Sequence, residues 1–176
     1  MQIPADAAIE ITRFERGDAQ GVIDVILQIQ REEFGFSLTA DDQPDLQSIP
    51  DFYQAGTGDF WVARLDGKII GTIGLKDIGA AQAALRKMFV AAPFRGREFG
   101  VARRLLSRLF DHGRERAITD IFLGTTDRFL AAHRFYEKNG FVEIAKEALP
   151  KSFPLMAVDT RFYVSRLDDQ REVRAP

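Results

Sequence analysis

The chain has 176 residues, a formal net charge of −2 at pH 7 and no cysteine. Because roughly 100 to 200 residues is the usual size of one domain, we expect residues 1–176 to form a single domain. The small negative charge supplies no basic surface for nucleic acid or an anionic membrane. The lack of cysteine excludes disulfides, thiolate metal sites and a cysteine nucleophile.

The sequence also gives no indication of a membrane segment, a leader or a metal site. It contains no apolar run approaching the roughly 20 residues that a spanning helix needs. Residues 1–10 lack a basic region and already contain Asp6 and Glu10, unlike a secretory signal. His112 and His133 are the only histidines, too few for a typical zinc site. We therefore expect a cytoplasmic protein that binds no metal, membrane or nucleic acid.

The first third of the chain predicts a strand, a helix and a loop. Residues 8–14 alternate between apolar and polar side chains, as in a half-buried strand. Asp18 can cap a helix whose apolar positions share one face, namely Val22, Val25, Ile26 and Ile29. Residues 35–50 are polar and contain Pro44, which predicts a loop that resumes as a short helix around residues 45–54.

A hairpin and a central strand follow. The dipeptide Asp66-Gly67 is the strongest two-residue turn signal in the sequence, and it lies between apolar segments at residues 60–64 and 68–75. These segments are therefore expected to pair as antiparallel strands. Residues 83–90 then predict the central strand of the sheet.

Helices and strands alternate in the second half. A helix is indicated by apolar residues that fall on one face, namely Val101, Ala102, Leu105, Leu106, Leu109 and Phe110. A later helix runs to Lys138, where Asn139-Gly140 provides a left-handed stop. Three more strands are expected at residues 118–123, 141–144 and 155–164. The order of elements predicts an α/β fold with a mixed sheet.

The segment between the central strand and the next helix has the layout of a phosphate cradle. It reads Arg95-Gly96-Arg97-Glu98-Phe99-Gly100 and leads directly into the helix. Backbone N–H groups in the first turn of a helix lack intrahelical acceptors, and the helix dipole adds partial positive charge. Gly96 and Gly100 let the backbone approach a ligand closely, while Arg95 and Arg97 add positive charge. The segment is therefore a candidate pyrophosphate site.

A second segment indicates which family of proteins the candidate pyrophosphate site resembles. Residues 131–141 read Ala-Ala-His-Arg-Phe-Tyr-Glu-Lys-Asn-Gly-Phe, where a helix stops and a strand begins. Together the two segments resemble the GNAT superfamily of acyl-CoA-dependent N-acyltransferases, and the resemblance covers most of the chain from Phe60 to Tyr163. It implies a mixed, mostly antiparallel central sheet, splayed between its fourth and fifth strands and flanked by about four helices.

The resemblance also implies how the cosubstrate acetyl-CoA binds. Its pantetheine arm would insert between the strands at residues 83–90 and 118–123, where backbone groups of Met88, Phe89 and Val90 would pair with its amides. The pyrophosphate would bind the cradle residues Arg95, Gly96, Arg97, Glu98, Phe99 and Gly100, together with Val101 of the helix.

The expected reaction needs a base, an oxyanion donor and an acid. A protonated amine is not a nucleophile, and a thiolate takes a proton as it leaves. By resemblance, the amine attacks the thioester directly in a ternary complex, a backbone N–H of the central strand polarises the carbonyl, and Tyr136 protonates the CoA sulfur. The base is open among water and four carboxylates, Glu32, Glu33, Asp77 and Asp159. Asp159 could instead pair with Arg161 on the same strand.

Two positions depart from the family pattern. Glu98 stands where a glycine is usual in the cradle, and a carboxylate beside a pyrophosphate is unfavourable unless it turns toward Arg95, Arg97 or solvent. Phe129 stands where many members carry an asparagine that reaches the pantetheine. The substitutions bear on diphosphate affinity and on one CoA contact respectively.

The acceptor is an amine of a small molecule or peptide that the sequence does not identify. Family members bind it with segments that correspond to residues 32–53 and 146–153. Five acids in the first segment would suit a cationic amine or form a solvated surface, namely Glu32, Glu33, Asp41, Asp42 and Asp45. The last strand, rich in Phe and Tyr, could pair with a second copy in a homodimer.

Two alternatives to an N-acetyltransferase belong to other classes. A non-catalytic acyl-CoA-binding module, a sensor or regulatory protein, would keep the cradle and lack an evident base. An unrelated α/β protein that binds another phosphate would make the Tyr136 segment a coincidence.

Overall fold

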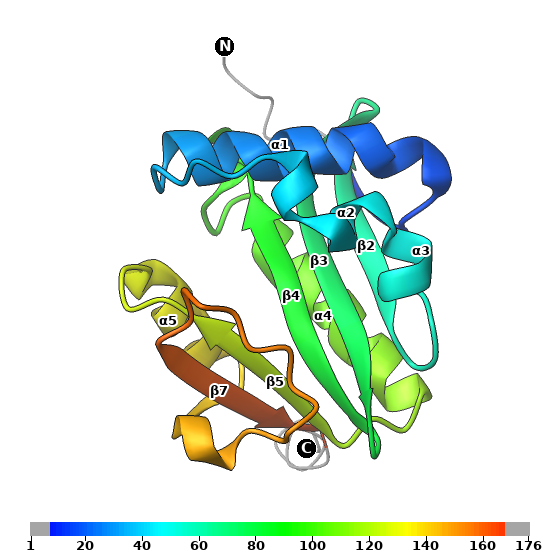
Figure 1. Cartoon of the computed structure of the whole chain (residues 1–176). Coiled ribbons are helices and arrows are strands. Elements are labelled where there is room, and N and C mark those ends of the chain that lie inside the picture. The colour runs from blue at the N-terminus through cyan, green and yellow to red at the C-terminus, as the bar shows by residue number, and fades with distance from the viewer. Residues whose placement is uncertain (1–7, 168–176) are drawn as a thin grey trace.

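The computed structural model describes residues 8–167, which contain one seven-stranded sheet (Figure 1). The strands are β1 (Ile9–Arg13), β2 (Asp59–Leu65), β3 (Lys68–Gly79), β4 (Gln82–Val90), β5 (Asp120–Thr125), β6 (Val142–Ile144) and β7 (Arg161–Arg166). Their order across the sheet is β1-β2-β3-β4-β5-β7-β6. The β4–β5 pair is parallel and the other neighbouring strands are antiparallel. The mixed, mostly antiparallel sheet is as expected from the sequence.

Helices cover both faces of this sheet. Those in residues 8–167 are α1 (Ala19–Glu32), α2 (Pro44–Gln47), α3 (Ile49–Phe52), α4 (Val101–Glu115) and α5 (Leu130–Lys138). In Figure 1, α1, α2 and α3 lie in front of β2, β3 and β4, and α4 lies behind them. Within residues 8–167, no helix combines the length and hydrophobicity needed to cross a bilayer.

The sheet divides between β4 and β5. The two strands pair only from Gln82 to Ala84 and from Asp120 to Phe122, and beyond these residues they separate. β4 stays paired with β3 as far as Val90, through a β-bulge in which Lys87 has a φ of 55°. The β5-facing edge of β4 therefore has no strand partner after Ala84 within the described chain.

Three apolar clusters hold the elements together. The largest joins α4 and α5 to the sheet and is built around buried residues such as Trp61, Leu105 and Leu109. A second cluster, including Ile26 and Tyr53, lies beneath α1, α2 and α3. A third packs the segment after β6 onto β4, β5 and β7. The expected apolar face of α4 is buried, and its arginines at positions 103, 104 and 108 are exposed.

Two turns connect β2, β3 and β4. Asp66-Gly67 forms the expected two-residue hairpin, in which both residues have positive φ and Leu65 pairs with Lys68. A second tight turn lies between Gly79 and Gln82 and uses two alanines with φ of 55° and 59°. Alanine is uncommon in this conformation, so no turn signal marks these residues in the sequence.

Three local expectations are wrong. The last strand begins at Arg161 instead of residue 155, because the chain turns at Met156, whose carbonyl accepts the Asp159 N–H at 3.1 Å. The helix expected at residues 45–54 is two short helices separated at Ser48, with Pro50 in the first turn of α3. Proline has no N–H to continue the preceding helix. Asp18 does not cap α1 with its side chain but accepts hydrogen bonds from Glu15 and Arg64.

Candidate active site

The cradle is a short loop between β4 and α4. Gly96 and Gly100 have φ of 118° and 61°, and the Gly100 N–H contacts the Gly96 carbonyl at 3.3 Å. Both conformations favour glycine because a Cβ atom is strained at positive φ. Phe94 and Phe99 meet edge to face, with ring centroids 6.0 Å apart, and anchor the loop on the core. The loop is thereby shaped to present the first N–H groups of α4 to an anion.

Arg95 connects this loop to α1. Its Nε donates to the carbonyl oxygen of Val90 at 2.7 Å, and its guanidinium forms a bidentate ion pair with Glu33. The predicted cradle arginine thus serves as a brace between the end of β4 and the end of α1. Arg97 is exposed beside it.

The two departures from the family pattern have different surroundings. Glu98 is exposed and forms no ion pair with a described residue, while its Oε1 lies 3.8 Å from where a Cβ on Gly96 would be. Phe129 packs on Phe34, with ring centroids 4.1 Å apart. Since Phe34 follows α1 and Phe129 precedes α5, this contact joins the two halves of the divided sheet.

The open edge of β4 offers backbone groups at the predicted positions. Ala91 donates its N–H to Ile70 of β3, so strand alternation turns the N–H of Val90 toward the opening. The Val90 carbonyl on that side is occupied by Arg95, while Met88 lies two residues earlier with the same orientation. Phe89 pairs with Thr72. Of the three predicted residues, Met88 and Val90 are therefore the ones that face the opening.

Tyr136 lies in α5, the helix that follows the open half of β5. Its side chain is 8% exposed and packs against Phe141 and Tyr163, with ring centroids 5.4 and 6.2 Å away. Its hydroxyl has no hydrogen-bond partner among the described residues. Burial raises the pKa of Tyr136 above its usual value, so the hydroxyl keeps its proton at neutral pH. It can donate a hydrogen bond to an anion that reaches it.

A hydrogen-bond network that runs from the buried His133, in the same helix as Tyr136, to the exposed Glu143 was missed in the sequence. His133 is placed with Nε2 2.7 Å from the Thr126 carbonyl oxygen and Nδ1 2.9 Å from a guanidinium nitrogen of Arg161. The carbonyl can only accept and the guanidinium can only donate, which requires a neutral imidazole with its proton on Nε2. Arg161 is also bidentate to Glu143. His133 therefore orients the loop after β5 and is not free to act as a base.

Most of the base candidates have structural roles. Glu33 is paired with Arg95, and Asp77 accepts backbone N–H groups of Thr57 and Gly79 at 3.0 and 2.8 Å. These backbone hydrogen bonds hold the pKa of Asp77 below its usual range. Glu32 is exposed on α1 and accepts a hydrogen bond from Gln28. A carboxylate that is held by an ion pair or by backbone hydrogen bonds, or that is solvated, is poorly suited to take a proton from a bound amine.

Asp159 differs from these three. It lies in the loop before β7, and the pairing with Arg161 expected from alternation is wrong because Arg161 pairs with Glu143. A Cβ on Gly124 would lie only 2.5 Å from Asp159 Oδ2, so the carboxylate covers the backbone of β5 where a side chain would stand. Burial raises the pKa of Asp159, opposed by the Met156 backbone and by Arg86.

A second buried cluster lies beside the bulge of β4. Lys87 Nζ is 2.7 Å from Gln43 Oε1 and 3.6 Å from Asp45, which also accepts the Tyr53 hydroxyl at 2.6 Å. Gln43 in turn exchanges hydrogen bonds with Gln30. Burial lowers the pKa of Lys87. The cluster ties α1 and α2 to β4, and no pattern in the sequence indicated that these separated residues would meet.

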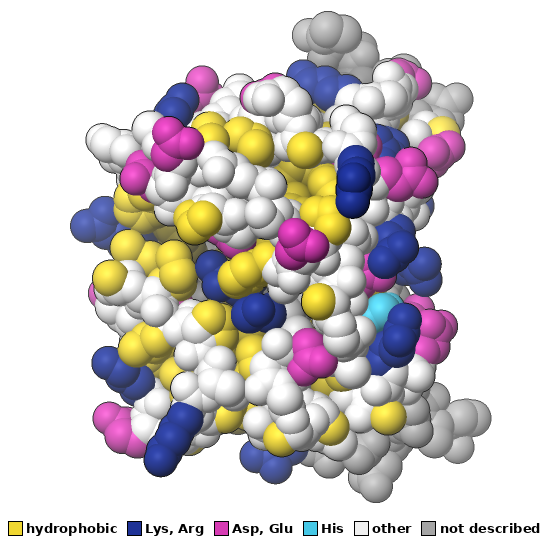
Figure 2. Space-filling view, turned by 45° about the vertical axis from the view of Figure 1, so that its right-hand side comes forward, with side chains coloured by type: hydrophobic (Ala, Val, Ile, Leu, Met, Phe, Trp, Pro, Cys, Tyr) yellow, Lys and Arg dark blue, Asp and Glu magenta, His cyan; other side chains and the backbone are white. Residues whose placement is uncertain are grey.

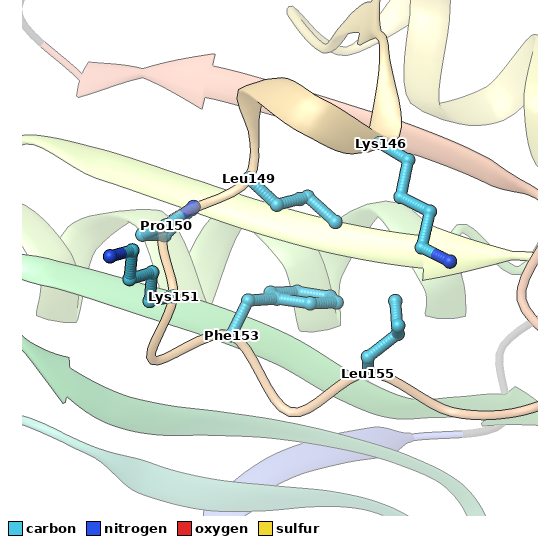
Figure 3. Close-up of a pocket in the computed structure, with 6 residues that line it drawn as sticks. All are labelled: Lys146, Leu149, Pro150, Lys151, Phe153 and Leu155. Atoms are coloured by element: carbon cyan, nitrogen blue, oxygen red, sulfur yellow. The ribbon is translucent and has the colours of Figure 1, made fainter.

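A shallow pocket lies along the segment after β6 (Figure 3). Its volume is about 190 Å³, and it is lined by Lys146, Leu149, Pro150, Lys151, Phe153 and Leu155. Apart from Leu155, these residues belong to the segment expected to face the acceptor. In Figure 3, Phe153 and Leu149 lie between the two lysines. Within residues 8–167, no group of side chains has the composition of a metal site.

Comparison with known proteins identifies the family of this arrangement. The family model described as "Acetyltransferase (GNAT) family" matches residues 23–141. The chain belongs to the GNAT acetyltransferase family. This membership supports acyltransferase activity and agrees with the divided sheet, the bulged β4 and the glycine loop described above.

Individual proteins resemble this GNAT protein to different degrees. A GNAT-family acetyltransferase from Staphylococcus aureus MU50 has a TM-score of 0.86 at 40% identity, covering 91% of this chain and 99% of that one. The PaiA N-acetyltransferase of Thermoplasma acidophilum, solved with coenzyme A, has a TM-score of 0.67 at 18% identity and shares the fold over 90% of this chain and 99% of its own. An N-acetylaspartate synthetase of Xenopus tropicalis is 32% identical over 102 residues, which are 57% of this chain. The match spans 37% of that relative's length.

Proposed function

We propose that the protein transfers the acetyl group of acetyl-CoA to the primary amine of an acceptor, by direct attack in a ternary complex. The observation that carries the proposal is the open edge of β4, which lies beside a glycine loop at the start of α4. The opening offers backbone partners for an extended amide chain, and the loop offers N–H groups for its pyrophosphate. These two features are adjacent and together support the binding of a CoA thioester.

In this proposal the cosubstrate is held mainly by backbone. The Met88 and Val90 groups that face the opening pair with the pantetheine amides, and the cradle from Arg95 to Val101 binds the pyrophosphate. Both arginines of the loop are exposed, but Arg95 is engaged by Glu33 whereas Arg97 forms no ion pair within residues 8–167. Glu98 is exposed, so its flexible side chain can move aside from the first turn of α4.

Two side chains carry separate steps of the proposed reaction. Asp159 takes a proton from the acceptor ammonium. Because burial raises the pKa of Asp159, that pKa lies closer to the pKa of the amine than the pKa of a solvated carboxylate does. The amine nitrogen then bonds to the thioester carbon while the carbon–sulfur bond breaks. Tyr136 donates a hydrogen bond to the leaving sulfur and so stabilises its negative charge. Of the two protons that the ammonium loses, one ends on the CoA thiol and one reaches solvent.

The assay of this function is acetyl-CoA-dependent thiol release by the purified chain with a broad amine panel. The name of the N-acetylaspartate synthetase relative makes aspartate the first amine to include. We expect one thiol per acetylated amine, with the product mass raised by one acetyl group. Tight acetyl-CoA binding without transfer to any amine would instead support the acyl-CoA-binding module.

A further inference from the structure

Two charged side chains flank the point where the sheet divides. Ala84 and Phe122 form the last β4–β5 pair, and both face the third apolar cluster. Arg86 and Gly124 lie two residues further along their strands, so alternation places them on the same face. Asp159 covers Gly124. Arg86 therefore stands on the β4 side of the opening and Asp159 on the β5 side.

Arg86 is held among groups that leave its charge unpaired. Its Cζ lies 5.4 Å from the ring centroid of Phe52, and its Nη2 lies 3.5 Å from Met156 Sδ. Lys76 Nζ lies 4.0 Å from the centroid of the same Phe52 ring. Within residues 8–167, neither cation forms an ion pair with a carboxylate. The Met156 sulfur accepts one weak hydrogen bond from Arg86, and the aromatic contacts orient both cations without using their other N–H donors.

The acids of the predicted acceptor segment are mostly engaged elsewhere. Glu33 pairs with Arg95, Asp45 is buried between Tyr53 and Lys87, and Asp42 caps a turn through Thr39. Asp41 accepts a hydrogen bond from Gln47. The face beside the opening is left with the unpaired cations Arg86 and Lys76 and with the carboxylate of Asp159. Two positive charges beside one negative charge would repel a polycation. Figure 2 shows Lys and Arg side chains near the middle of the visible face, with hydrophobic side chains above and below them.

We infer that Arg86, assisted by Lys76, binds a carboxylate of the acceptor, and that the acceptor is therefore an amino acid or a similar carboxylated amine. The inference rests on the proposed acetyl transfer and names its substrate class. The acceptor's ammonium faces Asp159 while its carboxylate faces Arg86, so that a zwitterion complements both sides of the opening. A guanidinium can hold the carboxylate through two parallel hydrogen bonds, which also orients the amine.

Matched acceptors test this assignment. Aspartate has two carboxylates, asparagine keeps only the α-carboxylate, and isoasparagine, its isomer, keeps only the side-chain carboxylate. Other L-amino acids are compared with their α-amides, and spermidine serves as the polycation. We expect the preferred carboxylated acceptor to exceed its amide in kcat/KM by about 10- to 100-fold, the range for a charge-assisted hydrogen bond.

Variants then connect this preference to Arg86. Arg86→Gln is expected to remove the preference by raising KM for the carboxylated acceptor, so that kcat/KM falls much more for the carboxylated acceptor than for its amide. Arg86→Lys should restore part of the preference, and Arg108→Gln on the exposed face of α4 is the control that leaves it unchanged. If the role of Arg86 were merely structural, the substitution would lower kcat/KM equally for both acceptors. Acetyl-CoA affinity of each variant is measured separately to show that the site is intact.

The outcomes separate this inference from the function beneath it. If amides and spermidine react as well as amino acids, or if Arg86→Gln leaves the preference unchanged, the carboxylate assignment is wrong and acetyl transfer stands. If no amine of either kind releases thiol from acetyl-CoA, the proposed function itself fails.

Discussion

Replacing Gly100 by alanine tests the cradle in a way that separates binding from stability. Gly100 has a φ of 61°, and a Cβ there meets only the Arg97 carbonyl oxygen, at 4.0 Å. The cost of the substitution in the free protein is therefore conformational, about 1 to 2 kcal/mol for an L-residue in the left-handed region. For a chain of this size that lowers Tm by roughly 2 to 8 °C.

The same methyl group lies where the pyrophosphate is proposed to approach the backbone. Loss of one charge-assisted hydrogen bond from the start of α4 costs about 1.5 to 3 kcal/mol, so we expect the Kd for acetyl-CoA to rise about 10- to 100-fold. Titration calorimetry measures the Kd, and a thermal scan measures Tm.

Gly67→Ala is the matched control. Gly67 lies in the β2–β3 turn with a φ of 79°, and a Cβ there would meet no atom within 4 Å, so its replacement carries similar strain far from the cradle. We expect a similar loss of Tm and unchanged affinity. If Gly100→Ala keeps the wild-type Kd, or if Gly67→Ala weakens binding equally, the cradle assignment is refuted.

Four further substitutions test individual roles. Tyr136→Phe should lower kcat with little change in acetyl-CoA affinity, and unchanged turnover would remove Tyr136 from the mechanism. Glu98→Gly should bind acetyl-CoA as well as the wild type or better, whereas a large loss would give that exposed carboxylate a positive role. Asp77→Asn should lower Tm at pH 7 and leave kcat intact; because the folded pKa is depressed, the wild-type advantage should disappear as pH falls below 3.8 through that pKa. Asp159→Asn should remove the fall of kcat/KM at low pH, which in the wild type reports protonation of Asp159 at a pKa above 3.8. An unaltered pH profile would favour water as the base.

The parts of the fold that depend on local patterns could be predicted from the sequence. The Asp66-Gly67 hairpin, the buried face of α4 and the stop at Gly140, with a φ of 90°, follow from turn chemistry and helical periodicity. The alanine turn before β4 could not be predicted because the strand pairing imposes its strained conformation. Residues 155–160 alternate well enough for a strand, but the Met156 turn removes them from the sheet.

The candidate site could be proposed from the sequence only where a motif is continuous in the chain. The cradle and Tyr136 belong to such segments. Contacts between distant side chains could not be read in advance, and these include the Glu33 pair that engages Arg95, the Phe34 contact of Phe129 and the Asp45 partner of Lys87. Each reassigns the role of a residue, as when Glu33 changes from a candidate base to a brace. The cytoplasmic location and a homodimer stay predictions.

Titration calorimetry of the full chain with acetyl-CoA, free CoA and ADP tests the central claim most directly. A site made of both the cradle and the open edge of β4 predicts one-to-one binding of acetyl-CoA that is clearly tighter than binding of ADP, because ADP lacks the pantetheine arm. Equal affinity for ADP and acetyl-CoA, or no binding of acetyl-CoA, would contradict a thioester site between β4 and β5.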